Sequence, residues 1–133
     1  TLVLFDLGHF KGINDQFGHA AGDEALRVFA NSARQAIRNT DIFGRIGGEE
    51  FAVLLSGVDP STAQTIADRI RSDFSRAAIA HESARIEATV SAGLAGAEKG
   101  DTSFDRLLAA ADSALYAAKR DGRDRVTSFA LAS

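Results

Sequence analysis

Short apolar runs alternate along the chain with longer segments in which hydrophobic residues recur at helical spacing. The run Leu2–Phe5 is apolar throughout, which is typical of a strand buried on both faces, and Asp6 is expected to end it. Residues 10–15 then predict a short helix that closes near Gly18. The dipeptide Gly22-Asp23 is expected to open a long helix. Its apolar positions are Leu26, Phe29, Ala33 and Ile37.

A hairpin and a further helix are predicted next. Residues 41–46 and 51–55 have the pattern of two strands, and Gly47-Gly48-Glu49-Glu50 between them is typical of a tight turn. Asp59-Pro60 indicates a helix start, with aspartate as the N-cap and proline at the first helical position. The apolar face of this helix consists of Ala63, Ile66, Ala67, Ile70 and Phe74.

The last part of the chain predicts a strand, a loop, a helix and a final strand. Alternating apolar residues at 86, 88, 90 and 92 indicate a half-buried strand. A polar loop follows at 96–102, and an amphipathic helix then runs to about Gly122. The apolar positions of that helix are Phe104, Leu107, Leu108, Ala111 and Leu115. Residues 125–129 are predicted to form the final strand.

This order of elements, β-α-α-β-β-α-β-α-β, predicts an α/β (α+β) fold in which a central mixed five-stranded sheet is wrapped by helices. The 133 residues correspond to a single domain, residues 1–133. The chain begins directly in an apolar run and contains no methionine. We therefore interpret it as a piece of a longer protein, truncated on its N-terminal side.

Composition narrows the classes of function. The absence of cysteine excludes a disulfide scaffold, a thiolate metal site and cysteine catalysis. A net charge of −3 argues against broad DNA or RNA binding, which needs a basic face. The longest apolar runs have four residues, far short of the ~20 that cross a bilayer. We expect no membrane segment in this piece and a cytoplasmic location, with any membrane anchor in segments outside it.

Three acidic residues are the first candidates for chemistry. Asp6 follows a buried strand, and Glu49 and Glu50 lie at the tip of the predicted hairpin. Acids in these places can direct oxygen ligands at Mg²⁺, which takes one or two carboxylates together with waters and substrate phosphates. Taken alone, however, Gly-Gly-Glu-Glu is more commonly a tight turn with solvated acids.

The segment from Phe10 to Asp23 is the second candidate. Backbone N–H groups at a strand-to-helix turn can bind phosphate, and Lys11 adds positive charge. Asn14 and Asp23 are short, directional side chains that could contact a base edge, and a carboxylate suits the N1–H and N2 donors of guanine. By spacing alone, helix capping by Asn14, Asp15 and Asp23 is the simpler interpretation.

Two pairs of charged residues could have either a ligand-binding or a structural role. Lys119 and Arg123 are four apart near a helix end, where they could reach a triphosphate or complement the helix dipole. Arg38 and Asp41 precede the hairpin and are also the pattern of a simple surface ion pair. The histidines have no partner at metal-ligand spacing, which argues against zinc. P-loop and serine-hydrolase motifs do not occur.

Taken together, the motifs resemble the GGDEF family of diguanylate cyclases, whose members condense two GTP molecules into cyclic di-GMP. The resemblance runs from Leu2 to Val126, and its signature is Arg45-Ile46-Gly47-Gly48-Glu49-Glu50-Phe51, the GGEEF form of active members. The other matching motifs are Asp6-Leu7, Phe10-Lys11, Ile13-Asn14-Asp15, Gly18-His19, Gly22-Asp23, Ala111-Asp112, Ala114-Leu115-Tyr116, Ala118-Lys119 and Gly122-Arg123.

The resemblance implies the palm-like fold of nucleotidyl cyclases and a set of site residues. It implies that Asp6 and Glu49 hold Mg²⁺ (or Mn²⁺), with the Leu7 carbonyl and Glu50 completing the site. Glu49 and Glu50 are the implied catalytic residues, with Glu49 as proton acceptor. The implied contacts to GTP are Asn14, His19 and Asp23 near the base and Phe10, Lys11, Lys119 and Arg123 at the phosphates. One domain binds one GTP, so a two-fold homodimer is expected to make the product.

Arg38-Asn39-Thr40-Asp41 also matches the RxxD inhibitory site of the family, with Arg69 as a second contact, which implies feedback by cyclic di-GMP. Gly8 stands where the family usually has a second aspartate, and the preceding family helix with its Leu-Thr-x-Leu-x-Asn-Arg motif is absent. Two hypotheses follow. The intact signature favours an Mg²⁺-dependent diguanylate cyclase domain, and Gly8 favours a non-catalytic cyclic di-GMP receptor. The retained ligand set disfavours a pure dimerisation module.

Overall fold

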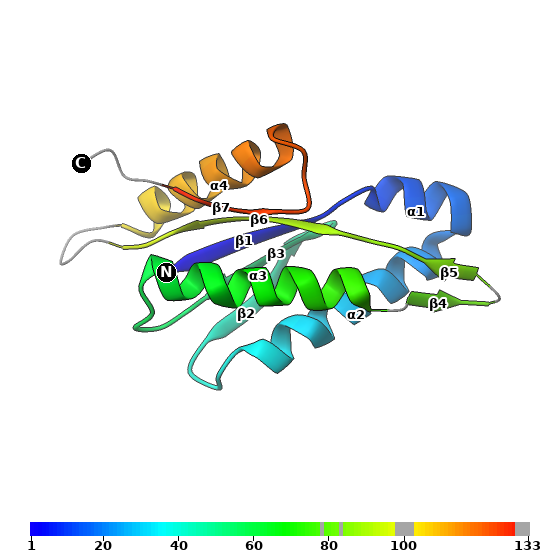
Figure 1. Ribbon diagram of the computed structural model, residues 1–133, viewed down its shortest axis with the longest axis horizontal. Helices are drawn as coiled ribbons and strands as arrows, with labels where there is room; N and C mark the ends of the chain where they lie inside the picture. The colour runs from blue at the N-terminus through cyan, green and yellow to red at the C-terminus, as the bar shows by residue number, and fades with distance from the viewer. Residues whose placement is uncertain (78, 83, 98–102, 130–133) are drawn as a thin grey trace.

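A five-stranded sheet forms the centre of the fold (Figure 1). The computed structural model describes residues 1–77, 79–82, 84–97 and 103–129. The strands lie in the order β2-β3-β1-β6-β7, and all neighbours are antiparallel except β6 and β7, which are parallel. The strands are β1 (Leu2–Leu7), β2 (Ile42–Gly47), β3 (Glu50–Leu54), β6 (Val90–Ala95) and β7 (Val126–Ser128). The predicted mixed five-stranded sheet is therefore confirmed.

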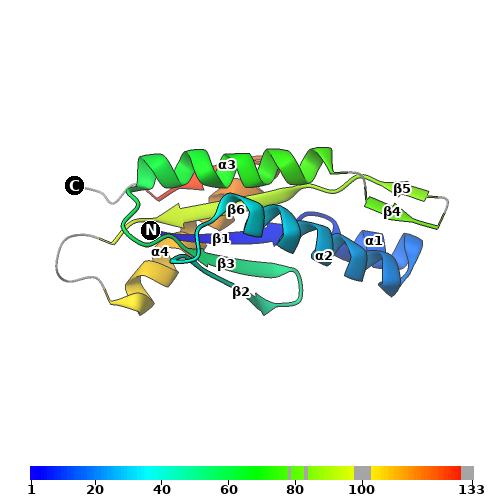
Figure 2. The same cartoon turned by 90° about the horizontal axis from the view of Figure 1, so that it is seen from below.

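Helices cover both faces of this sheet. Figure 2 shows α2 and α3 on one face and α4 on the other, while α1 extends beyond the end of β1. The helices are α1 (Phe10–Phe17), α2 (His19–Ala36), α3 (Pro60–Arg76) and α4 (Phe104–Arg120). A separate small hairpin, β4 (Ile79–His81) and β5 (Ala84–Ile86), follows α3. None of the helices in the described part of the chain is both long enough and apolar enough to span a membrane.

Strand β1 contributes to the core on both of its faces. Val3 and Phe5 belong to the larger cluster with α2 and α3, and Leu4 belongs to the smaller cluster with α4. Phe29 lies at the centre of the larger cluster, with its ring 5.3 Å from the ring of Phe5 and 4.8 Å from that of Phe51. Each such buried side chain contributes about 1.5–3 kcal/mol. Burial on both faces explains why the strand is apolar at consecutive positions.

Helix α4 and strand β6 approach each other closely at Gly93. A Cβ atom there would lie 2.0 Å from the Leu115 nitrogen and 2.5 Å from the Ala111 oxygen, both backbone atoms. Only glycine fits this contact, because backbone atoms cannot rotate out of the way. The close approach lets α4 lie directly on the sheet, and it brings the C-terminal end of α4 to the end of β1.

Several local predictions are confirmed and some boundaries are wrong. The Asp59 side chain accepts a hydrogen bond from the Thr62 N–H (2.7 Å), as expected of an N-cap. Strand β1 does not end at Asp6 but continues to Leu7. Helix α2 begins at His19, not at Gly22. Gly18 has a positive φ (93°), which separates α1 from α2, and α2 starts at the next residue.

The last third of the chain differs most from the prediction. The strand expected over 86–92 is two strands, since β5 ends at Ile86 and β6 begins at Val90. Strand β6 is buried throughout rather than half-buried, because α3 and α4 cover both of its faces. Strand β4 was missed. Phe104 and Leu108 are not core residues but are exposed, and most of the loop predicted at 96–102 lies outside the described residues.

Candidate active site

The end of β1 and the turn between β2 and β3 bring the three candidate acids together. Asp6 is the cross-strand partner of Glu50, and the Leu7 N–H donates to the Glu49 carbonyl (3.1 Å). The side chain of Arg45 donates twice to the Gly48 carbonyl, at 2.9 and 2.6 Å, which holds the turn. The β2–β3 register also shifts beside this turn, and such bulges re-aim side chains next to functional sites.

Asp6 is a buried carboxylate with a cationic partner. Only 7% of its side chain is exposed, and it forms an ion pair with the Lys119 ammonium group from α4. Burial raises the pKa of Glu50, and the neighbouring charge of Asp6 raises it further, whereas the charge of Lys119 lowers it. The negative charge of Asp6 thus disfavours the ionised form of Glu50. A bound cation beside them would relieve that repulsion.

A pocket of about 230 Å³ opens beside these acids. It is lined by residues of β1, the following turn, α1, the hairpin turn and the end of α4, namely Asp6, Leu7, His9, Phe10, Lys11, Glu49, Lys119 and Arg123. The structure thus brings together every residue predicted to contact metal or phosphate except Glu50. Glu50 lines the neighbouring groove between β3 and α4 together with Asp112.

The donor groups of this pocket are suited to magnesium. No group of three or more acidic or histidine side chains is gathered into a preformed metal site within the described residues. Mg²⁺ needs only one or two carboxylates when phosphates and waters complete its shell, and Asp6 and Glu49 provide that number. The cationic side of the pocket, with Lys11, Lys119 and Arg123, matches the charge of a metal-bound polyphosphate.

Gly8 lies next to this pocket and packs against β6. Its N–H donates to the Thr89 carbonyl (2.8 Å), and a Cβ atom at this position would lie 2.9 Å from the Thr89 hydroxyl oxygen. At the position where the family pattern has its second acid, Gly8 therefore packs tightly against Thr89.

The backbone that carries Arg123 has an unusual conformation. Gly122, Arg123 and Asp124 all have positive φ, at 123°, 62° and 46°. The Asp124 N–H donates to the buried Ser91 hydroxyl (3.1 Å), and its carboxylate accepts from Arg71 of α3 (2.9 Å). These contacts offset the cost of left-handed backbone in residues other than glycine.

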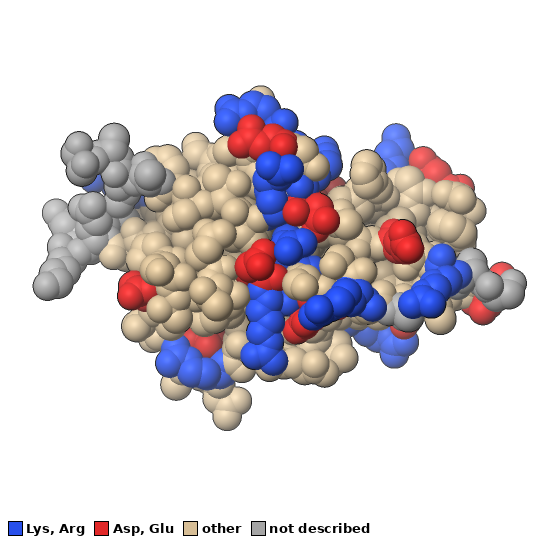
Figure 3. All heavy atoms as spheres, viewed as in Figure 1, with Lys and Arg blue, Asp and Glu red and all other residues tan. Residues whose placement is uncertain are grey.

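Sequence reasoning missed the two residues that anchor this loop. Arg71 and Asp124 are 53 residues apart, and no spacing rule connects them. Figure 3 shows the result as a band of alternating positive and negative side chains that crosses from the end of α4 over α3. The one sequence feature that could have indicated this contact is the charged side chain of Arg71, two residues after Arg69 on the same helix.

The residues predicted to contact guanine lie beyond this pocket, on α1 and α2. Asn14 is on α1, whereas His19 and Asp23 are exposed on α2. Asn14 Oδ1 is buried and has no hydrogen-bond partner among the described residues. The helix-capping interpretation is wrong for Asn14 and Asp23, because the N-cap of α1 is His9 and that of α2 is Gly18.

The RxxD residues form a local network of hydrogen bonds after α2. One Asp41 oxygen accepts from the Arg38 backbone N–H (2.8 Å) and Nε (3.3 Å), and the other accepts from Arg38 Nη2 (3.0 Å) and the Ser56 N–H (3.1 Å). The Arg38 guanidinium lowers the pKa of Asp41. Only 2% of the Asp41 side chain is exposed, against 59% for Arg38. Arg69 lies on α3, where it pairs with Asp73 at 3.7 Å.

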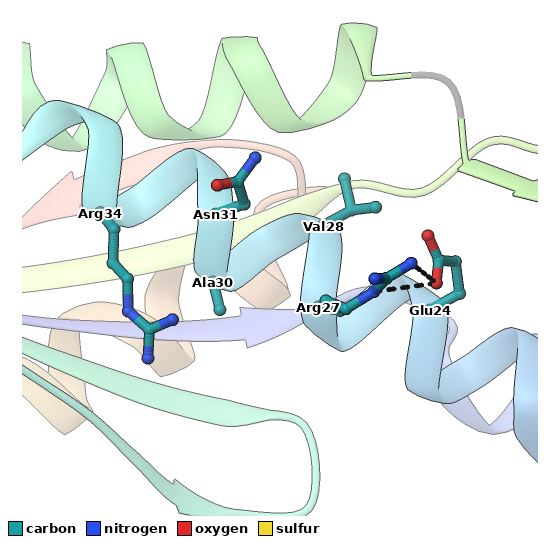
Figure 4. A pocket seen from close by; sticks show the side chains of 6 residues that line it. All are labelled: Glu24, Arg27, Val28, Ala30, Asn31 and Arg34. Atoms are coloured by element: carbon teal, nitrogen blue, oxygen red, sulfur yellow. Dashed lines mark hydrogen bonds and ion pairs between the residues drawn. The ribbon is translucent and has the colours of Figure 1, made fainter.

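A third hollow lies along α2 and is lined by none of these residues (Figure 4). Arg27 in this hollow pairs with Glu24, and the Arg34 guanidinium lies 5.3 Å from the centre of the Phe43 ring. Its arginines therefore already have partners, and it contains no residue of the predicted site.

Comparisons with known proteins identify the family. A family model described as "Diguanylate cyclase, GGDEF domain" matches residues 1–125. Diguanylate cyclase A of Treponema denticola is 38% identical over 127 residues, which cover 96% of this chain and 34% of that protein. Diguanylate cyclase DgcP of Pseudomonas aeruginosa is 40% identical over 128 residues, covering 94% and 18%. The chain thus spans about a third or less of these two relatives.

Solved structures with the same fold agree with this result. The active GGEEF domain of a diguanylate cyclase from Vibrio cholerae superposes with a TM-score of 0.91 at 34% identity, covering 98% of this chain and 83% of that one. The GGDEF domain of DgcB from Caulobacter crescentus, solved in complex with c-di-GMP, gives 0.90 at 36% identity, covering 96% and 75%. The chain belongs to the GGDEF family of diguanylate cyclase domains.

Proposed function

We propose that this domain condenses two GTP molecules into cyclic di-GMP, with Mg²⁺ (or Mn²⁺), as a two-fold pair of domains. The observation that carries the proposal is the single pocket in which Asp6 and Glu49 face Lys11, Lys119 and Arg123. Carboxylates for a metal and cations for phosphates in one pocket are what nucleotidyl transfer requires.

In this proposal each side chain has a defined task. Lys11, Lys119 and Arg123 bind and orient the triphosphate, and Asp6 and Glu49 would hold Mg²⁺ together with the Leu7 carbonyl and Glu50. When bound, the ion neutralises the triphosphate and lowers the pKa of the attacking 3′-hydroxyl. Asp23 accepts hydrogen bonds from guanine N1–H and N2, while Asn14 and His19 complete the nucleoside end of the site.

The reaction joins two nucleotides that are held by two domains. Each 3′-oxygen attacks the α-phosphorus of the other GTP, which forms an O3′–Pα bond and breaks the bond from Pα to the oxygen of the leaving pyrophosphate. The 3′-proton passes to Glu49 and then to water. A two-fold homodimer lets the same residues promote both attacks. Product would then bind at the RxxD site through the exposed Arg38 guanidinium, which Asp41 holds in place, with Arg69 as a second contact, and would inhibit further turnover.

A second candidate function is that of a cyclic di-GMP receptor without catalysis. Gly8 favours it, because the tight contact with Thr89 replaces an acid at the metal end of the site. The exposed guanidinium of Arg38 is compatible with either function.

Product analysis with the full-length protein separates the two functions. The protein is incubated with GTP and Mg²⁺, and the nucleotides are separated by chromatography. Cyclic di-GMP from the wild type but not from Glu49→Gln supports the cyclase, since a neutral amide is a poor Mg²⁺ ligand. Glu24→Gln, on α2 and outside the pocket of Asp6 and Glu49, is the matched control. Binding of cyclic di-GMP without any turnover favours the receptor, and near-normal product from Glu49→Gln refutes the role of Glu49.

A further inference from the structure

Gly22 lies at the contact between α1 and α2, directly against Asn14. A Cβ atom at position 22 would lie 1.9 Å from Asn14 Oδ1, 2.9 Å from Asn14 Cγ and 3.3 Å from Asn14 Nδ2. These three atoms are the nearest neighbours of that position, and all belong to one side chain. Any residue other than glycine would therefore force the Asn14 amide group out of its place.

The backbone itself does not require glycine at this position. Gly22 lies inside α2, and its N–H donates to the Gly18 carbonyl (3.3 Å). The φ angle of Gly22 is not positive, so alanine could adopt the same helical backbone. Glycine inside a helix costs about 1 kcal/mol relative to alanine. Glycine at position 22 therefore lowers helix stability and, among the described residues, leaves room for the Asn14 side chain.

The Asn14 side chain is itself held in an unfavourable way. Its Oδ1 is buried without a hydrogen-bond partner in the described part of the chain. A buried, unpaired polar group lowers stability, and such exceptions in a native fold call for a specific explanation. Two features at this contact therefore lower the stability of the fold, namely the glycine within α2 and the unpaired Asn14 oxygen on α1.

We propose that Gly22 is a positioning residue for base recognition, because it leaves the space between α1 and α2 in which the Asn14 amide lies for contact with guanine. This inference rests on the proposed function, in which Asn14 and Asp23 contact the base. Asp23 directly follows Gly22, so one turn of α2 both carries the guanine-binding carboxylate and sets the position of the amide that acts with it. A side chain at position 22 would consequently reduce selectivity for guanine and not only affinity.

The test is the substitution Gly22→Ala, with binding of GTP and ATP measured by calorimetry. We expect the affinity for GTP to fall about tenfold, the size of one lost hydrogen bond, while the weaker binding of ATP changes little. The matched control is Gly12→Ala in α1, where a Cβ atom would meet nothing within 4 Å. Gly12→Ala should leave GTP binding unchanged.

A double-mutant cycle with Asn14→Ala separates positioning from a general effect on the fold. Once the Asn14 side chain is gone, Gly22→Ala should cost no further GTP affinity, and the doubly substituted protein should unfold at the same temperature as Asn14→Ala or higher. An equal loss of affinity with and without the Asn14 side chain would overturn the inference. So would wild-type affinity and selectivity in Gly22→Ala.

A measurement without nucleotide distinguishes failure of this inference from failure of the proposed function. The side-chain amide signals of Asn14 in a ¹H–¹⁵N spectrum should move in Gly22→Ala and stay in place in Gly12→Ala. If the wild type does not bind GTP, the proposed function fails, whereas the contact between Gly22 and Asn14 is still decided by this spectrum. Unmoved Asn14 signals in Gly22→Ala would refute the contact itself.

Discussion

Replacing Asp41 by alanine should destabilise the domain, although this residue resembles part of an exposed ligand site. Its buried carboxylate accepts hydrogen bonds from two backbone N–H groups, those of Arg38 and Ser56. A hydrogen bond to a charged group contributes about 1.5–3 kcal/mol. Both donor residues are exposed, so water replaces part of each lost bond. We expect the free energy of unfolding to fall by about 2–3 kcal/mol at neutral pH.

The same prediction has a defined pH dependence. The hydrogen bond from the Arg38 side chain is the main reason why the pKa of Asp41 in the folded domain lies below its ordinary value of 3.8. The contribution of Asp41 is therefore fully present above that ordinary value and is lost as the pH falls through the lower folded value. The difference in stability between wild type and Asp41→Ala should be constant from pH 7 to 5 and shrink in more acidic solution.

Urea unfolding at a series of pH values measures this difference. Asp73→Ala is the control, because Asp73 forms only exposed ion pairs on α3 and should cost about 0.5 kcal/mol or less. A loss below about 1 kcal/mol for Asp41→Ala, or a loss that does not change with pH, would refute the structural role of the carboxylate.

Three further substitutions test other parts of the domain. Arg38→Ala should weaken cyclic di-GMP binding about ten- to hundredfold, as titration would measure, while GTP turnover stays or rises; equal affinities would reject the inhibitory site. Asp23→Asn should weaken GTP binding, because an amide cannot present two acceptors to guanine; a wild type that binds ATP as tightly as GTP in calorimetry would contradict this. Gly93→Ala should lower the free energy of unfolding by about 3 kcal/mol, because the new methyl group meets backbone atoms of α4; an unchanged denaturation midpoint would show that the approach is not close.

Hydrophobic spacing and local capping signals predicted most of the fold. Helix α3 begins at the Asp59-Pro60 signal, and the hairpin of β2 and β3 falls within a residue of its predicted bounds. Strands β4 and β5 have three residues each, too few for an alternating pattern to develop. Asp6 appeared to end β1 because a charge does not normally continue a buried strand, and its partner Lys119 comes from the other end of the chain.

The candidate site depended on resemblance more than on spacing. The spacing of Asn14 and Asp23 favoured helix caps, and the pairing of Lys119 with Arg123 favoured the helix dipole. Only the folded chain joins Lys119 to β1, through the close approach of α4 and β6 at Gly93. Contacts of this kind are set by packing between distant segments, which leaves no periodic signal in the sequence.

The ion pair between Asp6 and Lys119 has a consequence for folding in the absence of a divalent ion. A buried carboxylate without a partner costs several kcal/mol, and in this domain the partner is an ammonium group of the chain itself. The newly synthesised chain therefore needs no divalent ion to complete its fold, in contrast to small zinc domains that unfold when chelated. If the proposed function holds, a chelating agent should stop turnover reversibly and leave the melting temperature unchanged, because the divalent ion would act on the activity of a domain that is already folded.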